Sequence, residues 1–348
     1  MPQTAGPLLR VGMPLSVVTG LVVGDVILGD EIIFGLLCAV PLLVAPVEEP
    51  RRVVAWGALC VVIEALLGIS DNAYVNGDAA SAQAVRLGFA VLTTAAGAGL
   101  AYRRLQEEQH LRRITAVAKA AQRAILRPLP RTIGTWEVGY DYTGAYQESR
   151  VGGDLYDAQL TDAGLLVIVG DTRGKGLEAV RLAALVLGTF RHPSSRTADP
   201  ADVYAAMHDT VQQHGGDEDF VTAVLAEITR EGRCRIWNAG HPPPLVVRGG
   251  SATPVEAAAP VPPLGLGGKA HPSDVALSPG DVLLLYTDGL SEARRPSDRA
   301  FFPLLDAAAG AVGTGDLTTA VVALRDDATA WTGGALGDDV ALLAVRQP

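Results

Sequence analysis

The chain has 348 residues, more than one average domain, and its 28 Lys and Arg against 38 Asp and Glu give a formal net charge of −10. This balance argues against nucleic acid as a general partner, because binding a polyanion requires a basic face. The cysteines, Cys38, Cys60 and Cys234, form no metal-binding spacing and no disulfide framework, as expected for a reducing compartment.

Four apolar runs dominate the first hundred residues and together contain three charged residues. The runs cover 11–28, 32–47, 53–69 and 84–102. Each is at or just below the roughly 20 residues that cross the hydrocarbon of a bilayer. We therefore predict an all-α transmembrane domain of about four spans over 1–102; a buried soluble helical bundle is the alternative. Glu64 in the third run is either functional or a packing detail, since ionisable groups inside a membrane are costly.

The links between the apolar runs alternate in charge. Arg51 and Arg52 lie in one link, Asp71 and Asp78 lie in the next, and further arginines follow residue 102. The tendency of basic links to face the cytoplasm places the N-terminus and everything after residue 102 on that side. The first run lacks a small-residue cleavage site, so we expect no signal peptide. The sequence thus predicts a multi-pass protein of the cell membrane.

A helical connector is predicted over residues 103–130. Apolar residues recur there at alternating steps of three and four, at Leu111, Ile114, Ala118, Ala121 and Ile125. This seam suits either a helix packed on its own domain or a dimer-forming helix, and the pattern alone leaves both open. Two prolines that follow at 128 and 130 are expected to end the helix.

Short apolar strands and turns replace the long runs over 131–348, and we predict a layered α+β domain there. The predicted strands cover 165–170, 220–228, 234–238, 244–247, 282–286 and 340–345, and the predicted helices cover 177–190, 201–214 and 302–311. Several strands are apolar on both faces, which favours a sheet covered on both sides. The Pro- and Gly-rich stretch 249–271 is interpreted as a loop.

Four aspartates lie where predicted strands meet turns: Asp154, Asp171, Asp288 and Asp338. Carboxylates so far apart in sequence can meet only through a fold. A glycine beside each of them allows backbone or substrate to come close. Hard oxygen ligands suit Mg²⁺ or Mn²⁺, so the pattern predicts a two-metal hydrolase.

Five strings in order carry a family resemblance: RVGGDLYD (150–157), GDTRGKG (170–176), NAGHPPPL (238–245), LYTDGLSEAR (285–294) and DD (338–339). Together they resemble the signature of the metal-dependent type 2C serine/threonine protein phosphatases, in their bacterial SpoIIE-type branch. The resemblance implies a four-layer αββα sandwich with two Mn²⁺ or Mg²⁺ ions between the sheets. It also implies that Asp171 bridges the ions with help from the backbone carbonyl of Thr172, while Asp154, Asp288 and Asp338 complete the ligand set.

Several residues of these strings admit two interpretations. Asp339 is an alternative to Asp338 as ligand, and Ala341 stands where the family usually has threonine. Arg150 is either a phosphate-binding residue or a surface arginine, and Lys175 either approaches phosphate or only caps a turn. A further residue of the strings, His241, is interpreted as a structural histidine of a turn rather than a general acid.

The resemblance also implies a function and a partner. We predict a membrane-anchored phosphatase with a cytoplasmic catalytic domain that acts on phosphoserine or phosphothreonine of a regulatory protein. In this branch that protein is usually an anti-anti-sigma (STAS-type) factor. A homodimer through the connector helix is a further expectation. The alternative is a pseudophosphatase that binds a partner without turnover, against which the retention of all four aspartates argues.

Overall fold

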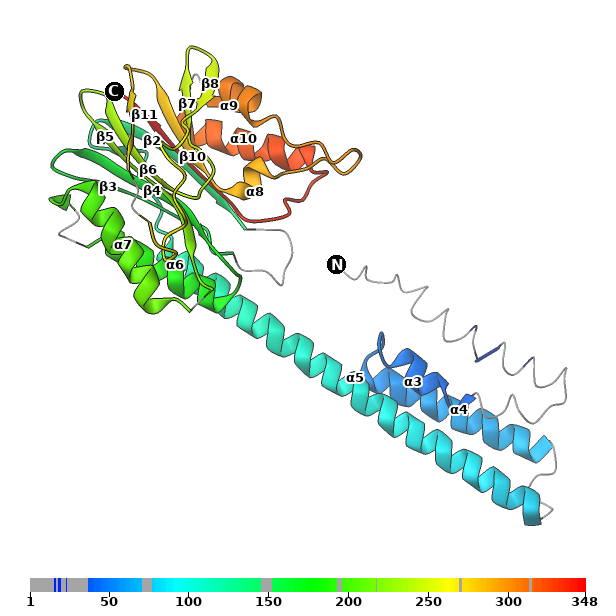
Figure 1. Cartoon of the computed structure of the whole chain (residues 1–348). Helices are drawn as coiled ribbons and strands as arrows, with labels where there is room; N and C mark the ends of the chain where they lie inside the picture. Colours follow the sequence, from blue (N-terminus) through cyan, green and yellow to red (C-terminus); the bar gives the residue numbers. More distant parts are fainter. Residues whose placement is uncertain are drawn as a thin grey trace. The chain divides into compact units, whose positions relative to one another are not determined.

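The structure is a computed structural model of the whole chain (Figure 1). It describes residues 16, 18, 19, 23, 37–70, 77–144, 152–192, 196–216, 218–268, 271–312 and 315–348. By its internal contacts the chain divides into two compact units, Met1–Leu111 and Arg112–Pro348.

The N-terminal unit is helical in its described part. It contains α3 (Val40–Val44), α4 (Pro50–Ser70) and the first portion of α5 (Gly77–Ile125). In the described residues, two helices are long and apolar enough to cross a membrane, and only 28% and 22% of their most apolar windows are buried. Such outward-facing apolar side chains suit contact with lipid better than the core of a soluble bundle.

These two helices contain the predicted spans 53–69 and 84–102. The predicted span 11–28 lies outside the described residues except for four positions, and 32–47 is described only from residue 37, where it holds the five-residue α3. Four spans therefore remain a prediction.

Small residues allow the helices of this unit to pack closely. A Cβ atom on Gly57 of α4 would lie 2.2 Å from Oγ1 of Thr94 in α5, and one on Gly97 would lie 2.7 Å from the carbonyl oxygen of Pro41. Close backbone approach at small residues is typical of membrane helices. Glu64 is buried among the helices, where its carboxylate accepts a hydrogen bond from the Cys38 thiol.

Two antiparallel sheets build the C-terminal unit. The six-stranded sheet has, in spatial order, β1 (Thr132–Ile133), β2 (Trp136–Thr143), β11 (Val340–Arg346), β10 (Val282–Tyr286), β7 (Leu245–Arg248) and β8 (Ser251–Pro254). The five-stranded sheet has β3 (Leu155–Leu160), β4 (Gly164–Thr172), β5 (Val221–Thr229), β6 (Arg233–Ala239) and β9 (Ser273–Ala276).

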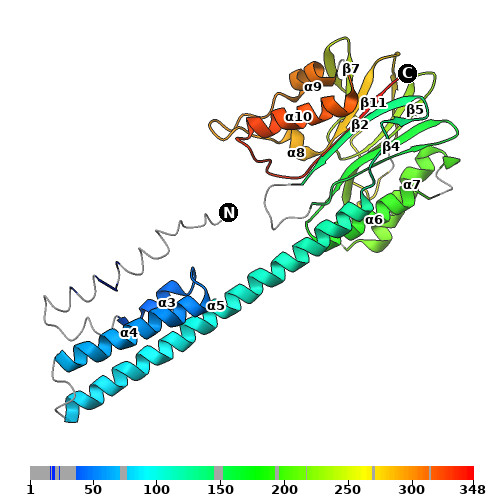
Figure 2. The ribbon, with the colours of Figure 1, turned by 180° about the vertical axis from the view of Figure 1, so that it is seen from behind.

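Helices cover the outer face of each sheet (Figures 1 and 2). On the five-stranded sheet lie α6 (Leu177–Phe190) and α7 (Pro200–His214). On the six-stranded sheet lie α9 (Leu304–Val312) and α10 (Leu317–Trp331), with the short α8 (Asp288–Ser291) directly after β10. This four-layer α+β sandwich confirms the predicted fold class.

Strand β11 shows why the central strands are apolar on both faces. Ala341, Leu343 and Val345 join the core cluster that includes residues of both sheets, whereas Leu342 and Ala344 join the cluster beneath α9 and α10. Side chains alternate between the faces of a strand, so a strand in the middle of four layers needs apolar residues at every position. The six predicted strands and three predicted helices of this unit are confirmed with nearly coincident ends.

The predicted loop 249–271 was wrong at its start, because β8 lies there. Strands β7 and β8 form a hairpin in which Arg248 pairs with Ser251, and the two residues between them, Gly249 and Gly250, both have positive φ. A Gly-Gly pair between two short strands is a known hairpin signal. The elements β2, β3, β9 and α10 were not predicted from the sequence.

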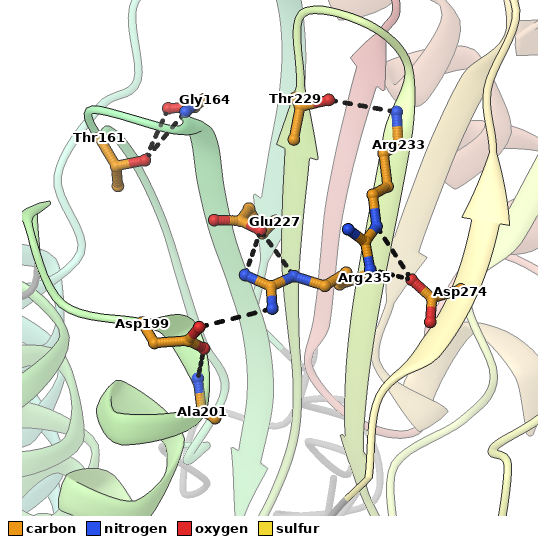
Figure 3. A network of polar contacts seen from close by, with 9 residues as sticks. All are labelled: Thr161, Gly164, Asp199, Ala201, Glu227, Thr229, Arg233, Arg235 and Asp274. Carbon is orange, nitrogen blue, oxygen red and sulfur yellow. Dashed lines mark hydrogen bonds and ion pairs between the residues drawn. The ribbon is translucent and has the colours of Figure 1, made fainter.

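A buried carboxylate on the five-stranded sheet is held by one arginine (Figure 3). Nε and a terminal nitrogen of Arg235 lie 2.8 and 2.7 Å from Oε2 of Glu227, whose side chain is only 4% exposed. The same guanidinium lies 3.6 Å from Asp199, which also accepts a hydrogen bond from the amide of Ala201 as the N-cap of α7. Arg235 thus links the sheet to the start of that helix.

We expect Arg235→Gln to lower the free energy of unfolding by about 3 kcal/mol, because it leaves the Glu227 carboxylate buried without its cation. The matched control is Arg233→Gln, which removes an ion pair with Asp274 whose partners are both more than half exposed. That change should cost less than about 1 kcal/mol. Denaturant unfolding of the detergent-solubilised chain measures both. If the two substitutions lowered the free energy of unfolding equally, the result would contradict the role assigned to Arg235.

Candidate functional site

The four predicted aspartates lie at the ends of strands from both sheets. Asp154 directly precedes β3, and Asp171 lies near the end of β4. The register pairs Leu155 with Gly170, so Asp154 and Asp171 are neighbours across this strand pair. In the other sheet Asp288 follows β10, and Asp338 lies just before β11. The sandwich therefore brings together carboxylates that are far apart in the sequence.

Burial and mutual repulsion disfavour the charged forms of these carboxyl groups. Burial is the largest cause that raises the pKa of Asp171 to about 7, and the charge of Asp288 is the next cause. The pKa of Asp154 is raised well above its ordinary value, first by burial and then by Asp171. Burial followed by the charge of Asp338 also raises the pKa of Asp288. Several negative charges thus act on one another at one place, which a bound cation would relieve.

Thr287 connects the two sheets at this site. Its hydroxyl donates a hydrogen bond of 2.8 Å to Oδ2 of Asp154 and accepts one of 2.9 Å from the amide of Ala341. Thr287 is fully buried, so these bonds fix one oxygen of Asp154 relative to β11. No role was predicted for this threonine, although its place directly before Asp288 in the sequence was an available signal.

Close packing around the aspartates requires glycine at two neighbouring positions. A Cβ atom on Gly153 would lie 1.6 Å from Oγ1 of Thr172, and one on Gly152 would lie 1.9 Å from Oδ2 of Asp339. Thr172 is itself fixed here, because its hydroxyl donates to the carbonyl oxygen of Gly153 at 3.0 Å. Any larger residue at either glycine would displace the groups around the aspartates.

The two adjacent aspartates at 338 and 339 have different surroundings. The Asp338 side chain is 49% exposed, and Nζ of Lys175 lies 3.0 and 3.1 Å from its two oxygens. Asp339 is 3% exposed and accepts a 2.6 Å hydrogen bond from the hydroxyl of Tyr142. Lys175 thus contacts a predicted ligand directly. Arg150, the other predicted phosphate-binding residue, lies outside the described residues.

The donor chemistry of the site fits a divalent cation. Four of the five predicted ligands are carboxylates and the fifth is the backbone carbonyl of Thr172, and both are oxygen donors of the kind that Mg²⁺ and Mn²⁺ prefer. In the described part of the chain, however, no three His, Cys, Asp or Glu side chains are already grouped as metal ligands. Asp338 is instead bound to Lys175 and would have to leave it to join the other carboxylates.

His241 has the structural role that the sequence favours. Its ring nitrogens lie 2.9 Å from the Thr222 hydroxyl and 3.0 Å from the carbonyl oxygen of Tyr286, and its amide donates to the Asn238 side chain. The ring therefore connects β5 with β10 across the two sheets. Burial is the largest cause that lowers the pKa of His241 to about 4, so the imidazole is neutral at pH 7.

Comparison with known proteins assigns the family. The family model described as Stage II sporulation protein E (SpoIIE) matches residues 161–348, more than half of the chain. The chain belongs to the SpoIIE family. The match includes every predicted metal ligand except Asp154, and the fold around these ligands is that of the PP2C-type phosphatases.

Three solved structures show the same fold. The RsbU and RsbW domains of Rv1364c from Mycobacterium tuberculosis are 28% identical with a TM-score of 0.52, and the match covers 61% of this chain and 60% of that one. The SiaA-PP2C domain of Pseudomonas aeruginosa is 20% identical with a TM-score of 0.58, covering 70% and 98%. The PP2C domain and regulatory fragment of SpoIIE from Bacillus subtilis are 18% identical with a TM-score of 0.51, covering 60% and 63%.

The neutral state of His241 predicts a pH-dependent stability. Because the pKa of His241 is lowered to about 4 in the fold from 6.5, its contribution is fully present above pH 6.5 and is lost as pH falls toward 4. We expect the wild-type chain to lose about 3 kcal/mol more of its unfolding free energy over this window than His241→Gln does. Denaturant unfolding at a series of pH values measures this difference.

His214→Gln, at an exposed position of α7, serves as the control and should keep the wild-type pH profile. A His241→Gln profile parallel to that of the wild type would show that His241 is not the buried neutral group described above.

Proposed function

We propose that the chain is a membrane-anchored protein phosphatase that hydrolyses phosphoserine and phosphothreonine on a cytoplasmic regulatory protein, with two Mn²⁺ or Mg²⁺ ions as cofactors. The observation that carries the proposal is the pair of Asp154 and Asp171, which are neighbours across β3 and β4 in a fold of the SpoIIE family. Asp288 follows β10 and acts on the charge of Asp171, and Asp338 lies just before β11. The raised pKa values of Asp154, Asp171 and Asp288 support it, because they reflect negative charge crowded at one place.

Each residue of the site has a proposed role. Asp154, Asp171, Asp288 and Asp338, together with the backbone carbonyl of Thr172, would hold the ions. When bound, such ions supply an activated water for in-line attack on phosphorus. Thr287 keeps one oxygen of Asp154 in place through its hydrogen bond.

Two basic residues are proposed to meet the phosphate. Lys175 would become available to it once Asp338 turns to the cations, since the two side chains are paired in this structure. Arg150 is proposed to bind the phosphate as well, which is one of the two roles that its place before Asp154 leaves open.

The proposed substrate is an anti-anti-sigma (STAS-type) factor. Regulatory proteins of sigma-factor control accompany the relatives: the structure from Mycobacterium tuberculosis contains an RsbU and an RsbW domain together. This chain spans 60% of the length of that structure, so the partner is transferred as a proposal. Dephosphorylation of such a factor by a membrane-bound enzyme would connect a membrane signal to transcription.

The connector helix supports a proposed homodimer over one part of its length. Ala118 is fully buried and packs with Val180 of α6, so the end of the predicted seam packs on its own domain. Leu111, Ile114 and Val117 are 61%, 44% and 60% exposed, and they recur every three residues along α5. A second copy of this helix would cover these apolar side chains.

We expect the detergent-solubilised chain to hydrolyse a chromogenic phosphate ester only with added Mn²⁺ or Mg²⁺. Asp171→Asn and Asp288→Asn should each reduce the rate by about a hundredfold or more, the scale expected when a metal-activated water is lost. Asp306→Asn, an exposed carboxylate of α9, should leave the rate unchanged. Full activity in EDTA would contradict the proposal.

The same assay distinguishes the two adjacent aspartates, since Asp339→Asn should cost much less than Asp338→Asn. The opposite order would make Asp339 the ligand. Binding of a phosphorylated partner without phosphate release at any metal concentration would favour the pseudophosphatase.

The membrane topology is tested by reporter fusions. Fusions after Arg104 should report the cytoplasm, whereas fusions near Asp30 or Asn76 should report the outer face, because basic links are retained inside. If all three fusions reported the same side of the membrane, the result would contradict a multi-pass protein with four spans.

A further inference from the structure

A pocket opens directly beside the predicted metal ligands. Its volume is about 460 Å³, and its lining includes Asp338 and Gly289, the residue after Asp288. The segment that follows α8 contributes Glu292, Arg294 and Arg299 to the same lining. A phosphorylated segment held at the aspartates would therefore place its neighbouring residues in this pocket.

Arg294 is held in place by an aromatic ring and not by an acidic side chain. Its guanidinium carbon lies 4.0 Å from the ring centroid of Phe301, with which it also forms an isolated antiparallel bridge. Stacking on a ring fixes the plane of a guanidinium while leaving its N–H donors available. Among the described residues no acidic side chain lies within ion-pair distance of Arg294.

The next residue, Arg295, differs from Arg294 because its guanidinium is bound within the same segment. It also stacks on a ring, 4.2 Å from the centroid of Trp331, but it forms two hydrogen bonds of 3.0 and 2.7 Å with Asp298. Its donors are thus used within the segment. The contrast indicates that Arg294 is arranged for a group outside the chain.

Arg299 is presented to the pocket by an unusual backbone. Its φ is +62°, the one positive value at a residue other than glycine in the described part of the chain. Two hydrogen bonds of 2.9 Å hold this turn, from the Arg299 amide to the Arg295 carbonyl and from the Arg295 amide to the Ala300 carbonyl. A left-handed conformation costs free energy at an arginine, and such costs concentrate at functional sites. No acidic partner for Arg299 lies within ion-pair distance among the described residues.

The net positive charge of the pocket lining favours a negatively charged ligand. Asp338 is already paired with Lys175, so the two arginines exceed the remaining Glu292 by one positive charge. The chain as a whole has a net charge of −10, which disfavours acidic partners in general. A local pair of unpaired guanidinium groups is therefore suited to carboxylates, which they can bind through two parallel hydrogen bonds.

We propose that this pocket, with Arg294 and Arg299, docks acidic side chains that flank the phosphorylated residue of the substrate. The inference rests on the proposed phosphatase function and deepens it, since it names the substrate class as acidic phosphopeptide segments. Arg294 and Arg299 act as specificity residues: they bind the flanking carboxylates and take no part in the attack on phosphorus.

The test compares two phosphoserine peptides on the full-length chain in detergent with Mn²⁺. One peptide has glutamates on both sides of the phosphoserine, and the other has glutamines at the same positions. A chromogenic phosphate ester, which has no flanks, reports the chemistry alone. We expect kcat/KM to be about tenfold higher for the acidic peptide, with a preference that weakens at high salt, since rim charges act mainly on association.

The double variant Arg294→Gln with Arg299→Gln should lower kcat/KM for the acidic peptide to that of the neutral one while leaving ester hydrolysis unchanged. Arg233→Gln, an exposed arginine of the other sheet, controls for the loss of positive charge and should keep the preference. Arg294→Glu should reverse it toward a peptide with lysine flanks. An unchanged preference in the double variant would overturn the docking proposal.

A binding measurement separates failure of docking from failure of the phosphatase function. Fluorescence anisotropy of the labelled acidic peptide without metal should show weaker binding to the double variant than to the wild type. If no phosphoester is hydrolysed by the wild type under any metal condition, the phosphatase proposal fails, whatever the anisotropy shows. If esters are hydrolysed and the two chains bind the peptide equally, the docking proposal alone fails.

Discussion

Repulsion among carboxylates at the junction of two sheets is the constraint on which the rest of the site depends. Asp154 is buried, and burial together with the neighbouring carboxylates raises the pKa of both Asp154 and Asp171. A protein would gain stability by replacing such residues, so their presence indicates a ligand of opposite charge. The pair between Lys175 and Asp338 offsets one of these charges.

The surrounding fold keeps the carboxylates together against this repulsion. Three connections join the two sheets near the site: the interdigitated apolar faces, the bonds of Thr287 to Asp154 and β11, and the bonds of His241 to Thr222 and Tyr286. The glycines at 152 and 153 add close backbone contact with Asp339 and Thr172. Function and stability therefore depend on the same junction.

Much of this arrangement could be predicted from the sequence, because the central strands carry strong apolar patterns and the aspartates adjoin glycines at their ends. The strings also contained Thr287 and His241, although only the histidine received a role. Tyr142 could not be found in this way, since its contact with Asp339 depends on the pairing of β2 with β11. Similarly, β8 was missed because its polar residues pair only through the Gly249-Gly250 hairpin. The arginine-lined pocket could not be predicted either, because the spacing of residues in the sequence does not reveal which guanidinium groups form ion pairs with acidic side chains.

A calorimetric titration of the purified full-length chain with Mn²⁺ tests most directly the central claim that the aspartates form a metal site. It requires no assumption about the substrate. We predict that two ions bind per chain and that Asp171→Asn, which removes one of the carboxylates assigned as ligands, abolishes the high-affinity binding. Asp306→Asn should leave the titration unchanged. A wild-type chain that binds no Mn²⁺, or an Asp171→Asn chain that binds it as tightly as the wild type, would contradict the assignment of the four aspartates as a metal site.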